Sequence, residues 1–344
     1  MSGAGIRVLR LGPVSLLLRP RVVAVSAVLL VMAAALGLVL LATGTLRFDL
    51  SEVMAGLMGG SGDPRLDRVI RGIRLPRVLT AALVGAALGL SGAVFQSITR
   101  NPLGSPDVIG FTTGAATGAI VQIILFDAGA AGTAAAAAGL GMLTALCVFL
   151  LARRGQSSGG DRLVLVGIGV GAVLSGLNTL LLVMGDLDQA MAAQVWLAGS
   201  LAARSWAHVG PAALGLVLLA PVALIHARRL DMMEMGDDMA RQVGVEVERV
   251  RLVMVVAAVG LTSVATAAAG PVTFVALAAP HLSRRLTGAP GPVLLPAALM
   301  GAVLVLAADL GSLQLRGTVS VPIGVMTGLL GGLYLLWLVA GRRR

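Results

Sequence analysis

The sequence contains no lysine, because all 26 of its basic residues are arginine. A phosphate-binding loop of the GxxxxGK[ST] type needs its lysine to contact the nucleotide phosphates, so the chain cannot have one. Schiff-base chemistry and a serine–lysine mechanism are excluded for the same reason. The chain is therefore not expected to be an enzyme, and if ATP drives its function, a partner subunit must hydrolyse the nucleotide.

Cysteine, histidine and aromatic residues are also scarce. Cys147 is the only cysteine, so an internal disulfide is impossible. The three histidines have no ligand-like spacing, and we expect neither a metal site nor another cofactor. A net charge of +10 is compatible with nucleic-acid binding, but only 3% of the residues are aromatic and could stack on bases. The arginines cluster at the ends of apolar runs, so nucleic acid is not an expected partner.

Apolar residues dominate what is present: 57% of the 344 residues are hydrophobic and 12% are charged. They form runs long enough to cross about 30 Å of hydrocarbon as helices. This pattern predicts an all-α polytopic membrane protein with one permease-like domain, residues 1–344, in the lipid bilayer of the cell membrane. Ten spans are expected, at residues 22–43, 76–98, 108–126, 129–152, 163–184, 209–227, 252–269, 272–286 (the shortest), 293–310 and 321–339.

The positions of the arginines predict the orientation. With the arginine-rich tail, residues 1–21, on the cytoplasmic side, every even-numbered span ends beside arginines on that side, and both termini are cytoplasmic. The first apolar run exceeds the roughly 7–15 residues of a signal peptide, so we expect it to be retained. The predicted outer loop, residues 44–75, breaks the rule because it contains five arginines, with Arg77 just beyond it. This segment is either a solvated, partly self-neutralised loop or a docking surface for an acidic partner.

The longest inner loop, residues 228–251, has apolar residues four apart at Met235, Met239, Val243 and Val247. This spacing predicts an amphipathic helix interrupted by glycines. Anionic lipid would repel the acidic residues of the loop, so a protein partner is favoured over the membrane surface.

Two chemistries other than ATP-driven transport remain to be weighed. Asp309 lies near the outer end of a span and is either functional or simply reaches the interface. An ion-coupled secondary transporter would need several such acids, paired at mid-membrane. An intramembrane protease would need Ser91, in a GxSG-like turn, to be aligned with a base such as His281.

Several segments resemble one known family. RLPR at residues 74–77, GAALGLSGAVFQ at 85–96 and RNPLGSPDVIG at 100–110 are similar to FecCD-type permeases of bacterial ABC importers for ferric siderophores, haem and cobalamin. The segments at residues 270–288 and 321–338 resemble the C-terminal half of the same permeases. The form of residues 270–286 is most like that of the ferric-siderophore branch, with cobalamin and haem as the alternative cargoes.

The resemblance implies a type II ABC importer permease fold. It also implies a second permease copy or paralogue, two ATPase subunits and an extracytoplasmic solute-binding protein as partners. By the same resemblance, docking of the binding protein falls to Arg71, Arg74 and Arg77, with Arg316 in place of an outward arginine that relatives have nearer Leu313. The residues implied in coupling to the ATPase are Gly236, Asp237, Asp238, Ala240 and Gly244. Those implied at the inner gate are Asn101, Pro102, Leu103, Ser157 and Asp161.

Overall fold

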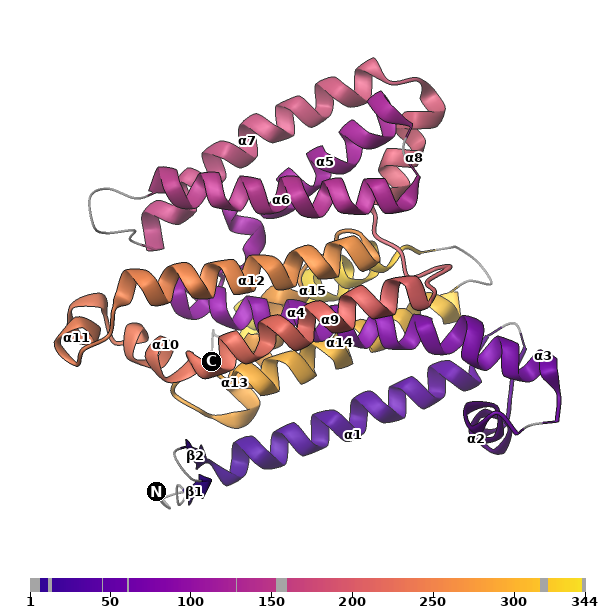
Figure 1. Cartoon of the computed structure of the whole chain (residues 1–344), viewed down its shortest axis with the longest axis horizontal. Helices are drawn as coiled ribbons and strands as arrows, with labels where there is room; N and C mark the ends of the chain where they lie inside the picture. The colour runs from indigo at the N-terminus through magenta and orange to yellow at the C-terminus, as the bar shows by residue number, and fades with distance from the viewer. Residues whose placement is uncertain are drawn as a thin grey trace.

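The computed structural model describes residues 7–11, 14–44, 46–60, 62–127, 129–152, 160–315 and 321–341. Its body is helical, as predicted. A short antiparallel hairpin of β1 (Arg7–Leu11) and β2 (Val14–Leu18) precedes the first helix. The long helices run roughly side by side, so the molecule is a bundle with two ends (Figure 1).

Each of the ten predicted spans corresponds to one helix of the bundle. These helices are α1 (Pro20–Ala42), α4 (Leu75–Thr99), α5 (Phe111–Phe126), α6 (Ala130–Ala152), α7 (Gly160–Met184), α9 (Trp206–Ile225), α12 (Val247–Ala269), α13 (Val275–Thr287), α14 (Leu294–Leu315) and α15 (Ile323–Gly341). In the described part of the chain, seven of them are long and apolar enough to cross a membrane, whereas α5 and α15 are apolar but shorter. The protein is therefore a multi-pass membrane protein.

The eighth predicted span, α13, differs from the others. It has 13 residues, contains Pro280 and begins after Phe274, whose φ of +65° lies in the left-handed region. At about 1.5 Å per residue, such a helix covers only part of a bilayer.

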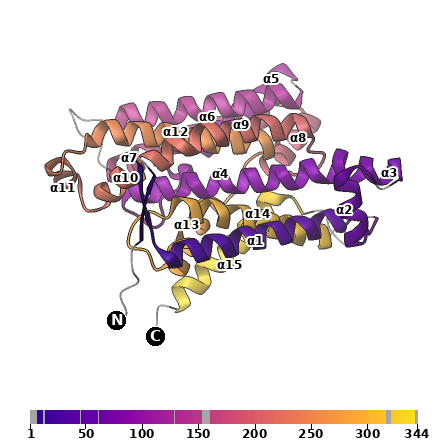
Figure 2. The same ribbon diagram turned by 60° about the horizontal axis from the view of Figure 1, so that its bottom comes forward.

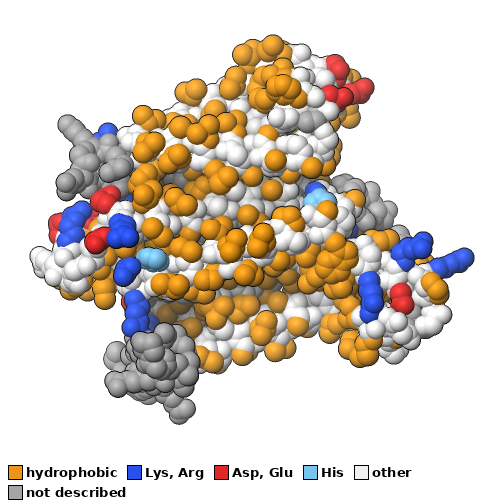
Figure 3. Space-filling view, viewed as in Figure 1, with side chains coloured by type: hydrophobic (Ala, Val, Ile, Leu, Met, Phe, Trp, Pro, Cys, Tyr) orange, Lys and Arg blue, Asp and Glu red, His pale blue; other side chains and the backbone are white. Residues whose placement is uncertain are grey.

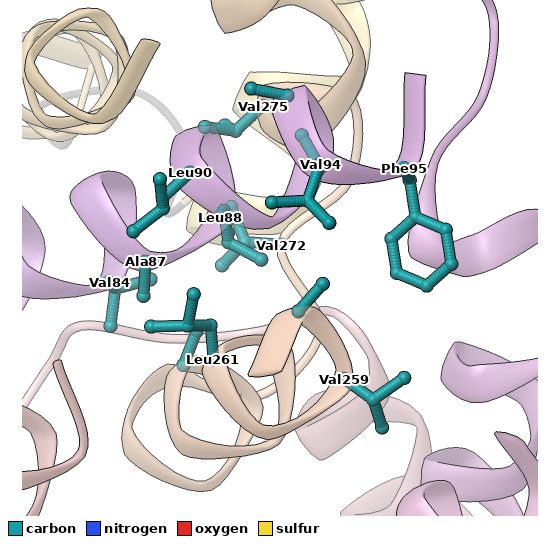
Figure 4. Close-up of a cluster of buried hydrophobic side chains, with 14 of the residues drawn as sticks. Val84, Ala87, Leu88, Leu90, Val94, Phe95, Val259, Leu261, Val272 and Val275 are labelled. Carbon is teal, nitrogen blue, oxygen red and sulfur yellow. The ribbon is translucent and has the colours of Figure 1, made fainter. Parts of the chain in front are cut away.

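Helix α4 is the centre of the bundle. In its most apolar stretch 78% of the residues are buried, against 11% for α1 and α7. Figure 4 shows Val84 and Ala87 of this helix beside Leu261 of α12. Helices α9, α13 and α14 pack against other sides of α4.

Glycines permit the close approach of α4 to α14. A Cβ added at Gly85 would lie 2.3 Å from the carbonyl oxygen of Gly301, and one added at Gly89 would lie 2.1 Å from that of Ala297. On another side of α4, a Cβ at Gly92 would lie 1.7 Å from the carbonyl oxygen of Ala276 in α13. These glycines of α4 thus serve tight helix packing.

Helices α5, α6 and α7 form a second group with α8 (Leu187–Leu197), drawn at the top of Figure 1. Ile120 and Ile124 of α5 are buried with Leu181 of α7 and Ala193 of α8. Helix α6 joins this group to the rest of the bundle by packing against α12.

The described residues of the predicted outer loop, residues 44–75, include short helices. The loop contains α2 (Leu50–Met58), α3 (Pro64–Asp67) and the π-helix η1 (Arg68–Arg74), which continues into α4. The side chain of Glu52 accepts the backbone N–H of Asp49 at 2.8 Å, and that of Asp63 accepts the N–H of Arg65 at 2.8 Å. The carboxylates of Glu52 and Asp63 thus accept backbone N–H groups at helix N-termini, where carboxylates are favoured.

The charged segments singled out in the sequence lie at opposite ends of the bundle. Helices α10 (Ala227–Glu234) and α11 (Asp237–Gln242) lie at one end, and α2 and α3 lie at the other (Figures 1 and 2). Figure 3 shows charged side chains gathered at both ends, with a mostly hydrophobic surface between them. This distribution matches that of a protein whose middle contacts lipid.

Candidate functional site

Three arginines spaced three residues apart tie the start of α4 to three other elements at the α2–α3 end. Arg71 closes the C-terminus of α2: its Nε donates to the carbonyl oxygen of Gly56 at 2.9 Å, and its Nη2 to that of Leu57 at 2.6 Å. Carbonyls in the last turn of a helix lack partners within the helix, and a cation there is favoured by the helix dipole. The exposed side chain of Arg71 therefore has a structural role.

Arg74 does the same for α1. Its Nη1 donates to the carbonyl oxygen of Leu41 in the last turn of α1 at 2.6 Å, and its Nη2 donates to that of Leu46 at 2.5 Å. The guanidinium also lies 4.7 Å from the centre of the Phe48 ring, within the range of a cation–π contact. Arg74 is thus held between α1 and the segment that follows it.

Arg77 forms a bidentate ion pair with Asp309 of α14. Nε lies 2.9 Å from Oδ2 and Nη2 lies 2.6 Å from Oδ1, and the two side chains are 16% and 1% exposed. Asp309 thus neither reaches the interface nor stands as an unpaired intramembrane acid. The structure thus assigns Asp309 a structural contact between α14 and the start of α4.

A cavity of about 210 Å³ lies beside these groups, between α1, the start of α4 and α14. Thr43, Arg74, Arg77 and Asp309 supply polar atoms to its wall, and Leu40 and Ile73 are among its apolar residues. Arg316, the fourth residue expected in docking, lies outside the described residues. Three further arginines, Arg47, Arg65 and Arg68, are exposed at this end of the bundle.

At the other end, α10 and α11 are firmly packed onto the bundle. Leu230 and Met233 of α10 and Ala240 of α11 are buried in the main core. Gly236 and Gly244, which flank α11, have φ values of +117° and +85°. A side chain is disfavoured in this region, so the chain requires glycine at both turns. Of the predicted coupling residues, Ala240, Gly236 and Gly244 therefore set the shape of this segment.

The two predicted coupling acids differ in their surroundings. The Oδ2 atom of Asp237 lies 2.7 Å from Nη2 of Arg251, a fully buried side chain of α12. Asp238 is 92% exposed and pairs with Arg241, one turn further along, at 2.9 Å. Asp238 is therefore the acid that a partner can reach.

An exposed apolar strip lies beside Asp238. Met235, Met239 and Val243 are 71%, 50% and 63% exposed, whereas Val247, the fourth member of the predicted stripe, is buried. Three of the four apolar residues of the predicted amphipathic pattern are thus exposed, and Val247 belongs to the core. An exposed apolar strip next to charges is typical of a protein-interaction surface.

The predicted inner gate follows α4 at the same end. Arg100 has a φ of +51°, the N–H of Asn101 donates to the carbonyl oxygen of Gln96 at 3.1 Å, and the side chain of Asn101 accepts the N–H of Leu103 at 2.9 Å. These bonds terminate α4 and form a tight turn in which Asn101, Pro102 and Leu103 are exposed. Ser157 and the side chain of Asp161 lie outside the described residues.

The protease hypothesis fails on geometry. Ser91 is fully buried and donates to the carbonyl oxygen of Ala258 at 2.7 Å, with Thr262 Oγ1 2.8 Å away. His281 instead contacts the hydroxyl group of Tyr334. Ser91 therefore joins α4 to α12, and among the described residues its hydroxyl group bonds to Ala258 and Thr262 rather than to a base.

Membrane-length helices, a tightly packed central helix and charged surfaces at both ends are the features of a polytopic membrane protein. Residues 29–341 match the FecCD transport family. The chain belongs to this family, and so is a permease of the ABC importer class rather than an enzyme.

Individual relatives agree with this assignment. The chain is 48% identical to the ferric enterobactin transport system permease protein FepG of Escherichia coli over 307 residues, 88% of this chain and 92% of that protein. It is 34% identical to the Fe(3+)-citrate import system permease protein YfmE of Bacillus subtilis, covering 91% and 93%. It is also 34% identical to the cobalamin import system permease protein BtuC of Halobacterium salinarum, covering 82% and 76%.

A solved metal-chelate type ABC transporter in an inward-facing conformation has a similar structure. The TM-score is 0.83 at 29% sequence identity, and the match covers 93% of this chain and 99% of that one. The similarity therefore extends over the whole bundle.

Proposed function

We propose that this chain forms the membrane pathway for a ferric siderophore delivered by an extracytoplasmic binding protein and driven by partner ATPases. The 48% identity to a ferric enterobactin permease is the observation that carries the cargo assignment. In this proposal ten helices cross or enter the membrane. The α10–α11 end and both termini are cytoplasmic, in agreement with the arginine distribution.

The ATPase partner binds at α10 and α11. The exposed strip of Met235, Met239 and Val243 and the exposed Asp238 supply the apolar and acidic contacts. Because α10 is anchored in the main core, displacement of this surface moves the bundle rather than a free loop. The turn at Asn101–Leu103 lies at the same end and forms part of the inner gate.

A second permease copy or paralogue packs against α7. This helix is largely exposed, and its exposed positions include the small residues Ser175, Gly176 and Thr179. Small residues let helices approach closely in lipid, so a face of this kind favours another helix as its neighbour. The pathway then lies between the two permeases and opens alternately by rocking of packed helices.

The cargo is tested by uptake in a strain that lacks this gene. Restoring the wild-type chain, together with its partner subunits, is expected to restore accumulation of a labelled ferric siderophore. Labelled cobalamin and haem, offered in parallel, are expected to show no gene-dependent uptake. Gene-dependent uptake of cobalamin or haem alone would contradict the siderophore assignment.

Docking of the binding protein is best tested at the exposed arginines. Reversing Arg77 would place a second carboxylate beside the buried Asp309 and confound docking with stability. In Arg65→Glu/Arg68→Glu, the association rate with the binding protein is expected to fall roughly tenfold at low salt, since charge steering typically accelerates association by roughly 10–1,000-fold. At high salt the association rates of the variant and the wild type should converge, because salt screens the charges.

The matched control is Arg162→Glu, at an exposed position where α7 begins, at the opposite end of the bundle. Its association rate should equal that of the wild type. If reversal of Arg65 and Arg68 leaves the rate at low salt unchanged, the docking surface is elsewhere.

A further inference from the structure

Arg284 joins three helices at the α10–α11 end of the bundle. Its Nη2 lies 2.5 Å from Oε1 of Glu234 in α10 and 3.1 Å from Oγ of Ser97 in α4. The side chains of Arg284 and Glu234 are 29% and 17% exposed, so the pair is largely shielded from water. We refer to Glu234, Arg284 and Ser97 as the Arg284 clamp.

The three members of the clamp lie in the last turns of their helices. Glu234 ends α10, Arg284 is in the last turn of α13 and Ser97 is in the last turn of α4. The C-terminal end of a helix carries partial negative charge, which a nearby cation stabilises. One guanidinium of α13 therefore bonds to side chains at the ends of α10 and α4. Such a site fixes the relative positions of α10, α13 and α4.

The other arginine that anchors this surface connects nearer segments. Arg251 is paired with Glu248 of its own helix and with Asp237, 14 residues earlier in the chain. The contacts of Arg284 span 50 and 187 residues. Arg251 thus fixes α11 on α12, whereas Arg284 connects α10 to the end of the central helix.

The clamp lies close to the predicted gate. Ser97 precedes Asn101 by one helical turn, and a Cβ added at Gly236, between α10 and α11, would lie 3.7 Å from Nη1 of Arg100. A displacement of α10 therefore reaches the end of α4 through the clamp over a short distance. The partly buried ion pair provides a contact that must move with α10 or break.

We propose that Arg284 is a positioning residue that transmits movement of α10 to α4 and α13, and so couples ATP hydrolysis in the partner subunits to opening of the pathway. The inference extends the transport function to a specific contact. It predicts that breaking the clamp leaves hydrolysis running without productive transport.

The test uses the complete transporter in proteoliposomes, with its ATPases and binding protein, and measures uptake and ATP hydrolysis in parallel. In Glu234→Gln and in Arg284→Gln, uptake per ATP hydrolysed is expected to fall roughly tenfold. Typical coupling free energies correspond to changes of roughly 5–150-fold, and the expected fall lies within that range. Ser97→Ala removes only the weaker arm and should have a smaller effect. The control is Arg285→Gln, which removes the same charge from the next residue, whose guanidinium lies over the ring of Trp337.

The exchanged pair Glu234→Arg/Arg284→Glu decides between transmission and simple loss of structure. Recovery of uptake per ATP in this double variant, with both single variants uncoupled, would support the proposal. A proportional fall of uptake and hydrolysis, or failure of the exchange to restore coupling, would overturn it. Absence of siderophore uptake by the wild-type transporter would instead contradict the proposed cargo and leave the coupling ratio measurable with the true one.

Discussion

Replacing Arg77 with alanine is expected to destabilise the protein by about 3–5 kcal/mol, the usual cost of removing one partner from a buried ion pair. The physical reason is that the Asp309 carboxyl group, 1% exposed, would lose both hydrogen bonds from the guanidinium and stay buried without that partner. The measurement is thermal unfolding of the purified variant in detergent, with the wild type alongside.

Replacing both residues of the ion pair by hydrophobic residues of similar volume distinguishes the effect of the charges from the effect of packing. In Arg77→Met/Asp309→Leu both charges are removed and the volume is largely kept, and such exchanges are often neutral or stabilising. We therefore expect the double variant to unfold close to the wild type and well above Arg77→Ala. An equal loss of stability in both variants would contradict this account. Because stability is restored, binding-protein docking to the double variant also reports whether Arg77 itself takes part in docking.

Replacing Gly89 with alanine is expected to force α4 and α14 apart. The added Cβ would lie 2.1 Å from the carbonyl oxygen of Ala297 and 3.2 Å from Cα of Gly301. The obstacle is backbone, so a change of rotamer cannot relieve the clash. Overpacking typically costs about 1–3 kcal/mol, and here we expect the upper end of that range or more. The measurement is the yield of folded, monodisperse protein and its unfolding temperature in detergent.

Gly139 of α6 provides the control. A Cβ added there meets nothing within 4 Å, and alanine is the better helix former. Gly139→Ala should therefore be as stable as the wild type or slightly more stable. If Gly89→Ala were as stable as Gly139→Ala, the close approach of α4 and α14 would not be essential to the fold.

Hydropathy predicted the long apolar helices well but missed the short helices between the first two of them. Each of the ten expected segments coincides with a helix, since an apolar run of sufficient length is a property of the segment alone. Helices α2, α3 and η1 were missed within residues 44–75. Their signals were short and local, such as the capping box formed by Asp49 and Glu52, and the many charges of this region suggested a loop.

The roles assigned to the candidate site residues remain predictions, and the structure shows their surroundings. Asn101 lies in an exposed turn, the glycines beside α11 have positive φ values, and Asp238 is exposed. Ala240, however, is buried, and Arg71 and Arg74 bind helix carbonyls of their own chain. The contacts of Arg284 could not be predicted, because an arginine at the end of an apolar run is expected in any inner loop.

The sequence by itself determined that this is a multi-pass permease without its own nucleotide chemistry. The apolar runs, the absence of lysine and the family motifs are all properties of the linear sequence and need no knowledge of which residues are neighbours in space. Only the tertiary structure decided which charges are partners. Arg77 and Asp309 are 232 residues apart, and Arg284 and Glu234 are 50 apart. Such pairs depend on which helices become neighbours, and that choice is made by the packing of small residues over whole helix faces.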